Sequence, residues 1–212
     1  LPKIVAKIER KEAVKNLNEI VHEADAVMVA RGDLGIELPE TRVAILQKEI
    51  IAASLSAVRP VIVATQMMKS MTENPRPTRA EVSDVTNAVI DHADAVMLSE
   101  ESAMGKYPVE TIRTMSEIIA NTEESPFDNV YQTIGMNLRS EYATMVRSVY
   151  ELAKSYDAEI ILLMSESGFT ARLMSHFRPD SRLFVATNNA KAWNRMALFW
   201  GVDATLFADN TQ

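Results

Sequence analysis

The 212-residue sequence predicts an α/β protein in which half of a TIM (β/α)8 barrel is followed by a smaller α/β domain. Apolar, β-branched runs alternate with helical patterns from the first residues onward, which is typical of parallel strands covered by helices. In addition, Ala24-Asp-Ala-Val-Met28 recurs two βα units later as Ala93-Asp-Ala-Val-Met97, as a barrel built from repeated units predicts. A chance likeness between two buried strands is the alternative explanation of this repeat.

The first part of the chain, residues 1–123, contains four such units. We expect strands over 3–9, 25–30, 60–65 and 94–99, and helices over 11–23, 40–57, 78–91 and 108–123. Thr78-Arg-Ala-Glu81 is a capping box, and Pro108 fits the first turn of a helix. A TIM barrel needs eight strands, so the other half is expected to come from residues upstream of Leu1.

Residues 124–136 break the alternation and are interpreted as a linker. Residues 137–212 then form the smaller α/β domain, which we expect to be truncated after its third strand. Its expected helices cover 138–155, 168–177 and 189–200, and its expected strands cover 159–164, 182–187 and 202–207.

Composition narrows the functional classes. The net charge of −7 and the pI near 5.1 argue against a surface for nucleic acid or an anionic membrane. The chain has no cysteine, which excludes disulfides and thiolate metal sites, and no apolar window approaches the ~18 residues of a membrane span. These features favour a cytoplasmic protein.

Charged residues end the first two expected strands. Lys7 and Glu9 are two residues apart, so on a strand both point to the same face, and Asp33 follows the next strand. A lysine and two carboxylates on neighbouring strand ends are typical of a site for Mg²⁺ and a phosphorylated anion. The alternative is a set of structural ion pairs in which Glu9 and Asp33 pair with Lys7 and Arg31.

Ordered motifs along nearly the whole chain resemble the pyruvate kinase family. They are Lys7-Ile-Glu9, Met28-Val-Ala-Arg-Gly-Asp-Leu-Gly35, Val63-Ala-Thr-Gln-Met67, Asn74-Pro-Arg-Pro-Thr-Arg-Ala-Glu81, Ala95-Val-Met-Leu-Ser99 and Gly105-Lys-Tyr-Pro108. The resemblance implies transfer of a phosphoryl group from phosphoenolpyruvate to ADP, giving pyruvate and ATP in glycolysis. It also implies Mg²⁺ (or Mn²⁺), K⁺ held by residues outside this chain, and a homo-oligomer, commonly a tetramer.

The resemblance also implies residue roles in catalysis. Glu9 and Asp33 would bind the metal, and Lys7 would stabilise the phosphoryl group in flight. The amides of Gly32 and Asp33 would hold the substrate carboxylate, and Thr65 would act near the enolate carbon in proton delivery. The alternative for Thr65 is a cap on a helix starting at Gln66-Met-Met.

Two further expectations rest on the same resemblance, and one motif departs from it. In Ser165-Glu-Ser-Gly-Phe-Thr170, residues Ser165, Ser167, Gly168 and Thr170 would grip the phosphate of a sugar-phosphate or nucleotide effector; the alternative is a plain N-cap turn. Arg79 would reach toward a neighbouring subunit. Ser99-Glu-Glu-Ser-Ala103 departs from the usual Ser-Gly-Glu-Thr-Ala, because Glu100 replaces a glycine.

Two other functions remain open: a related lyase or mutase barrel that also uses phosphoenolpyruvate and Mg²⁺, and an inactive protein that binds an effector or a partner. For the isolated chain we expect no turnover, and we expect exposed strand edges to drive dimerisation or aggregation.

Overall fold

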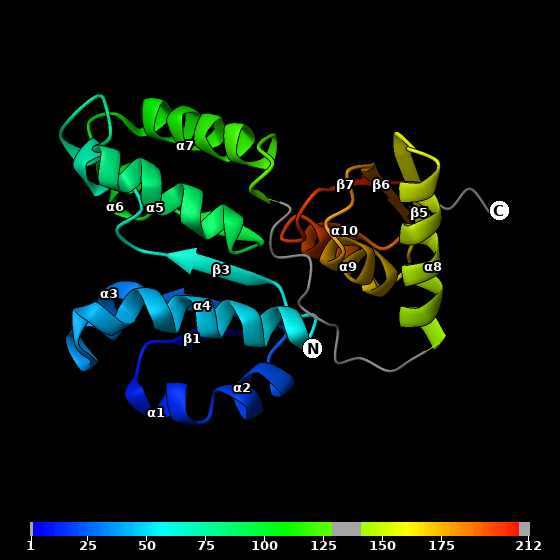
Figure 1. The fold of residues 1–212 in the computed structure, drawn as a ribbon, viewed down its shortest axis with the longest axis horizontal. Helices are drawn as coiled ribbons and strands as arrows, with labels where there is room; N and C mark the ends of the chain where they lie inside the picture. The colour runs from blue at the N-terminus through cyan, green and yellow to red at the C-terminus, as the bar shows by residue number, and fades with distance from the viewer. Residues whose placement is uncertain (1, 129–140, 208–212) are drawn as a thin grey trace. The chain divides into compact units, whose positions relative to one another are not determined.

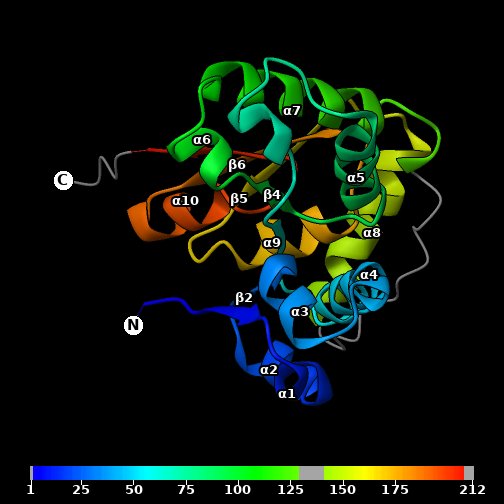
Figure 2. The same ribbon diagram turned by 90° about the vertical axis from the view of Figure 1, so that its left-hand side faces the viewer.

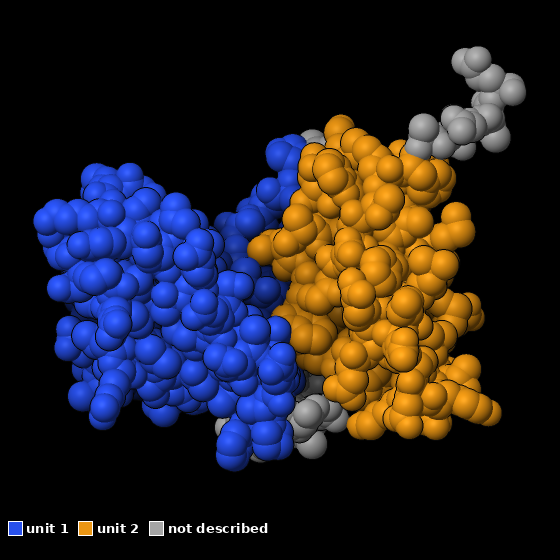
Figure 3. Space-filling model, turned by 90° about the horizontal axis from the view of Figure 1, so that it is seen from above, with its two compact units in different colours: residues 1–135 blue, residues 136–212 orange. Residues whose placement is uncertain are grey.

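A computed structural model describes residues 2–128 and 141–207. The chain divides into two compact units, residues 1–135 and residues 136–212, which are coloured separately in Figure 3. The predicted linker, residues 124–136, lies partly outside the described residues. Each unit is described by itself below.

Unit 1 is built on a parallel sheet of four strands in the order β1-β2-β3-β4. The strands are β1 (Val5–Ile8), β2 (Ala26–Ala30), β3 (Val61–Ala64) and β4 (Ala95–Met97). Their registers align Lys7 with Met28, Ala30 with Ala64, and Ala64 with Met97. The carboxyl ends of the four strands therefore meet along one edge of the sheet.

Helices connect these strands in unit 1 (Figure 1). They are α1 (Lys11–Lys15), α2 (Leu17–Glu23), α3 (Arg31–Glu37), α4 (Glu40–Ser56), the 3₁₀ helix η1 (Lys69–Thr72), α5 (Arg79–Ile90), α6 (Glu100–Ala103) and α7 (Pro108–Glu123). The predicted capping box is confirmed: the Thr78 side chain accepts from the Glu81 amide, and the Glu81 side chain accepts from the Thr78 amide. Helices α5 and α7 lie side by side.

The predicted single helix over 11–23 is two short helices, α1 and α2 (Figure 2). The break is at Asn16, whose backbone amide and side-chain amide both donate to the Glu12 carbonyl, each at 3.1 Å. Asn16 is both the C-cap of α1 and the N-cap of α2, and its φ of −104° and ψ of 21° lie outside the helical region, which separates the two helices.

The core of unit 1 lies between the sheet and its helices. Strand residues Ile8, Val27, Val29, Val61 and Val63 are fully buried there. They pack with helical residues such as Ile50, Val85 and Met115. Burial of this apolar surface is the main stabilising contribution to the unit.

Unit 2 contains a three-stranded parallel sheet in the order β5-β6-β7. Its elements are α8 (Glu141–Ser155), β5 (Ile160–Met164), α9 (Phe169–His176), β6 (Arg182–Thr187), α10 (Ala190–Met196) and β7 (Val202–Leu206). The parallel sheets confirm the predicted α/β class. Residues 138–140 of the first helix predicted for this domain lie outside the described residues.

Helix α10 is shorter than the predicted helix over 189–200. The Asn189 side chain caps it by accepting from the Lys191 and Ala192 amides. After Met196 the bonds tighten to the third preceding residue, as in Leu198 to Arg195, and Gly201 has a φ of +66°. In the described parts of both units, no helix is long and apolar enough to span a membrane.

Candidate active site at the carboxyl edge of unit 1

Lys7, Glu9 and Asp33 meet at the carboxyl edge of the unit 1 sheet. The Lys7 ammonium nitrogen lies 2.7 Å from Glu9 Oε2 and 3.9 Å from Asp33 Oδ2. Lys7 is on β1, Glu9 is the first residue after this strand, and Asp33 is in the first turn of α3. The i, i+2 spacing on β1 therefore places lysine and glutamate together as predicted, and the β1–β2 pairing brings Asp33 next to them.

Electrostatic coupling within this cluster favours the charged forms. The hydrogen bond between the two side chains raises the pKa of Lys7 above its usual value and lowers the pKa of Glu9. The side chains of Lys7, Glu9 and Asp33 are 53%, 34% and 54% exposed. The cluster is thus open to solvent, and β1, which carries Lys7, is an edge strand of the described sheet.

Two carboxylates beside one ammonium form a suitable donor set for a hard divalent cation. Mg²⁺ prefers oxygen ligands and keeps several positions for water and substrate oxygens, so two carboxylates suffice on the protein side. No group of three or more histidine, cysteine, aspartate or glutamate side chains is placed to hold a metal ion within residues 2–128 and 141–207. Glu9 and Asp33 supply two carboxylates from neighbouring strand ends, and both lie near the Lys7 ammonium.

Arg31 pairs with Asp84 and not with Asp33, so this part of the ion-pair alternative is wrong, whereas its other part, the Lys7–Glu9 pair, is present. Arg31 Nη1 donates to both carboxylate oxygens of Asp84 on α5, each at 2.7 Å. Its Nη2 donates to the Thr65 carbonyl at 2.6 Å and contacts Met67 Sδ at 2.7 Å. Arg31 is only 9% exposed. The sequence offered one signal for this role, a charged residue directly after a buried strand.

Thr65 follows β3 and contacts the first turn of α3. Its hydroxyl oxygen accepts from the Gly32 amide at 2.9 Å. Thr65 does not cap a helix at Gln66, since the next helix, η1, begins only at Lys69. Thr65 and Gln66 instead have φ values of +71° and +55°. These are left-handed conformations that non-glycine residues rarely adopt.

Glu101 is a buried residue at the same edge that the sequence interpretation missed. It is 3% exposed, and its carboxylate accepts from the Met68 amide at 3.2 Å and from the Ser99 amide at 2.8 Å. It thereby joins the segment after β3 to the segment after β4. Glu100, the departure from the family pattern, is exposed at the first residue of α6.

The chain after α6 has no room for a side chain at the position of Gly105. A Cβ at this position would lie 2.5 Å from the Glu101 carbonyl oxygen and 3.2 Å from the Thr72 Cα. Real Cβ atoms essentially never approach another atom to 2.5 Å. The glycine therefore permits the close approach of η1 and α6 beside the site.

In unit 2, residues 165–170 form a capping turn before α9. The Ser165 hydroxyl accepts from the Gly168 amide at 3.1 Å, and the Ser167 hydroxyl accepts from the Phe169 amide at 3.3 Å. Gly168 has a φ of +79° and is the N-cap of α9, with Thr170 in the first turn. This geometry is that of the N-cap turn named above as the alternative; it does not test an effector role. Arg79 is exposed at the first residue of α5.

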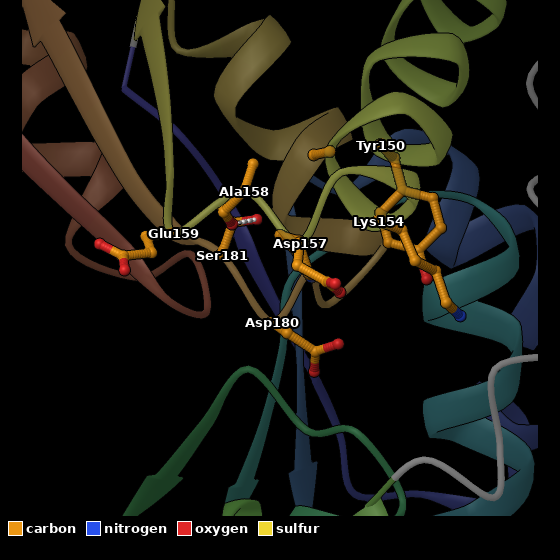
Figure 4. A pocket seen from close by; sticks show the side chains of 9 residues that line it. Tyr150, Lys154, Asp157, Ala158, Glu159, Asp180 and Ser181 are labelled. Carbon is orange, nitrogen blue, oxygen red and sulfur yellow. Dashed lines mark hydrogen bonds between the residues drawn. The ribbon is translucent and has the colours of Figure 1, made fainter.

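Two hollows lie away from Lys7, Glu9 and Asp33. One, of about 370 Å³, is lined by residues of unit 1 that include Arg31, Lys48 and Asp91. The other, of about 410 Å³, lies at the amino ends of β5 and β6 in unit 2; Figure 4 shows its side chains, with the hydrogen bond from the Ser181 hydroxyl to the Ala158 carbonyl. Neither contains a residue that the sequence predicted to be functional.

Comparisons with known protein families agree over both units. The family model described as pyruvate kinase, barrel domain, matches residues 2–112, and that described as pyruvate kinase, alpha/beta domain, matches residues 143–212.

Curated relatives and a solved structure give the same result. A pyruvate kinase of Debaryomyces hansenii is 43% identical over 98% of this chain and 42% of its own length. Pyruvate kinase 2 of Synechocystis is 42% identical over 97% of this chain and 34% of its own length. The crystal structure of a pyruvate kinase from Cryptosporidium parvum matches with a TM-score of 0.92 and 37% identity, covering 97% of this chain and 42% of that chain. The chain thus spans between about a third and two fifths of the length of these relatives.

Proposed function

The chain belongs to the pyruvate kinase family, and we propose that it forms the carboxyl-terminal part of an enzyme that transfers a phosphoryl group from phosphoenolpyruvate to ADP. The products are pyruvate and ATP, as in glycolysis. Residues 1–123 are proposed as the second half of the catalytic barrel, 124–136 as a linker and 137–212 as part of a regulatory domain.

The observation that carries this proposal is the cluster of Lys7, Glu9 and Asp33 at the carboxyl edge of a parallel sheet. In barrel enzymes this edge holds the active site. Phosphoryl transfer depends mainly on positioning and on fixed charge near the transferring oxygens. The Lys7 ammonium, held at 2.7 Å from Glu9, supplies such a charge.

Glu9 and Asp33 are the proposed protein ligands of Mg²⁺ (or Mn²⁺). When bound, the metal would neutralise negative charge on phosphate and substrate oxygens. The Lys7 ammonium already lies within 2.7 Å and 3.9 Å of one oxygen from each carboxylate, so both acids face a common cationic position. A K⁺ requirement is proposed from the family, with ligands outside this chain.

Gly32 and Thr65 are proposed to act on the organic part of the substrate. The amides of Gly32 and Asp33 would bind the substrate carboxylate. The Gly32 amide now donates to the Thr65 hydroxyl, so carboxylate binding to this amide would release that hydroxyl beside the substrate. A hydroxyl is a poor acid by itself, so Thr65 is proposed to deliver a proton to the enolate carbon through a water relay.

Regulation and assembly are proposed from the family alone. Ser165, Ser167, Gly168 and Thr170 would bind the phosphate of a sugar-phosphate or nucleotide effector. Arg79 would contact a neighbouring subunit of a homo-oligomer, commonly a tetramer. The enzyme is proposed to act in the cytoplasm.

The test is pyruvate formation from phosphoenolpyruvate, ADP and Mg²⁺ by the product of the intact reading frame. Asp33→Asn is expected to lower kcat by at least about a hundredfold. Asp25→Asn is the matched control, because Asp25 precedes β2 at the opposite edge and pairs with Lys3 at 2.7 Å. Equal activity of the Asp33→Asn variant and the wild type would contradict the metal role.

Other outcomes favour the remaining functions. Consumption of phosphoenolpyruvate without ADP would favour a lyase or mutase. Binding of phosphoenolpyruvate without turnover would favour an inactive, effector-binding protein. The isolated 212-residue chain, assayed beside the intact product, is expected to show no turnover.

A further inference from the structure

Arg31 joins three elements at the carboxyl edge of unit 1. It is the first residue of α3, directly after β2. One guanidinium nitrogen holds Asp84 on α5, and the other holds the carbonyl of Thr65 after β3. A 9% exposed guanidinium with these partners is fixed in place, because a buried charge is costly without its counterion.

The segment held by Arg31 is strained. Thr65 and Gln66 are consecutive non-glycine residues with φ values of +71° and +55°. Such conformations persist where surrounding contacts over-determine them, and they gather at functional sites. Two contacts fix Thr65 here: its carbonyl accepts from Arg31, and its hydroxyl accepts from the amide of Gly32, the residue after Arg31.

We propose that Arg31 is a positioning residue. It holds the segment Thr65–Gln66 against the first turn of α3, which contains Gly32 and Asp33, so that the Thr65 hydroxyl keeps the orientation needed at the reacting carbon. This inference rests on the function proposed above. The Arg31 guanidinium is engaged with Asp84 and with the Thr65 carbonyl. It therefore acts through Thr65.

Arginine is required for this role because its planar fork binds two partners with different nitrogens. Asp84 takes Nη1, whereas the Thr65 carbonyl takes Nη2. A lysine carries a single ammonium on a flexible stem and does not reproduce this fork. Arg31→Lys therefore keeps the charge and removes the bridge.

The kinetic test uses the intact reading frame with Arg31→Lys and, as matched control, Arg59→Lys. Arg59 is half-buried before β3, and its guanidinium donates to the His22 carbonyl at 2.8 Å on the opposite edge of the same sheet. Arg31→Lys is expected to lower kcat by about ten- to a hundredfold, as misplacement of a reacting group does, while the KM for ADP stays within about twofold. Arg59→Lys is expected to keep kcat.

A double-mutant cycle separates positioning from general stabilisation. If Arg31 acts through Thr65, adding Arg31→Lys to Thr65→Val lowers kcat by less than about threefold further, because effects on one shared interaction are not additive. Full multiplication of the two losses would overturn the proposal. So would a kcat for Arg31→Lys within about twofold of the wild type.

A second measurement does not depend on activity. The Gly32 amide is hydrogen-bonded to the Thr65 hydroxyl, so its hydrogen exchange, followed by NMR, reports the turn directly. Arg31→Lys is expected to accelerate this exchange at least about tenfold, while amides of β2 keep their rates. Wild-type protection of Gly32 in Arg31→Lys would overturn the proposal even in an active enzyme.

The two measurements also separate failure of the function from failure of the inference. If the wild type is inactive but Gly32 exchanges faster in Arg31→Lys, the kinase assignment is refuted and the positioning role of Arg31 stands. If the wild type is active and Arg31→Lys changes neither Gly32 exchange nor kcat, only the positioning role of Arg31 is refuted. If the circular dichroism spectrum of Arg31→Lys shows that this variant is unfolded, Arg31→Gln replaces it. The glutamine amide nitrogen donates to one acceptor without burying a charge.

Discussion

Replacing Glu101 is expected to destabilise unit 1 through two backbone amides. The carboxylate of this 3% exposed residue accepts from the fully buried Met68 amide and the partly buried Ser99 amide. A buried donor left without a partner costs about 1–3 kcal/mol, so Glu101→Ala should lower the free energy of unfolding by about 3 kcal/mol. Glu101→Gln keeps one accepting oxygen and should lose about half as much.

The assay must report on unit 1. Both tryptophans of the chain, Trp193 and Trp200, lie in unit 2, so tryptophan fluorescence does not follow the change. Native-state hydrogen exchange of core amides in β2 and β3 reports the stability of unit 1. A loss of 3 kcal/mol corresponds to about a hundredfold loss of protection of these amides. Glu100→Ala, at the exposed neighbouring position, should change protection less than about threefold. Equal losses in Glu100→Ala and Glu101→Ala would refute the reasoning.

Three further predictions concern local charge and backbone conformation. The hydrogen bond from Lys7 lowers the pKa of Glu9. The stability that this bond contributes is therefore present above the usual pKa of a glutamate and is lost as pH falls through the lowered pKa. Lys7→Met should raise the Glu9 pKa in an NMR titration, and an unchanged pKa would contradict this. Thr78→Ala, which removes the confirmed cap of α5, should cost about 1 kcal/mol by hydrogen exchange of that helix, with no loss arguing against the cap. Gly168→Ala should cost at least about 1 kcal/mol in tryptophan-monitored urea unfolding, because φ is +79° and the new Cβ would lie 3.3 Å from Met196 Cγ; a stabilised variant would refute the strain.

Much of the fold could be predicted from local patterns. The apolar runs ending at Ile8, Ala30 and Ala64 are strands at the predicted places, and α7 begins at Pro108 as its first-turn proline indicated. Short elements could not be predicted, because their stability comes from tertiary contacts. Helix α6 has only four residues and is fixed by Glu101, whose partners are distant in sequence or adjacent to the strand end.

The site was predictable where neighbours in sequence are also neighbours in space. Lys7 and Glu9 meet because of strand periodicity, and Asp33 joins them because parallel strands end together. Arg31 shows the limit of this reasoning. Its partner Asp84 lies 53 residues away on α5, a distance in sequence over which no periodic pattern specifies a side-chain pair.

The strand order of unit 1 has a consequence for how the chain folds. Each strand pairs with the one that precedes it in the sequence, so the sheet grows in the order in which the polypeptide is synthesised. Every new pairing closes a loop of a single βα unit, which keeps the loop-closure entropy of this parallel sheet small. Lys7 and Glu9 are laid down first, then Arg31 and its neighbours, and Thr65 only with the third strand. The carboxyl edge is therefore built stepwise during synthesis, and it is completed when Asp84 on α5 reaches Arg31 and Glu101 after β4 reaches the Met68 amide.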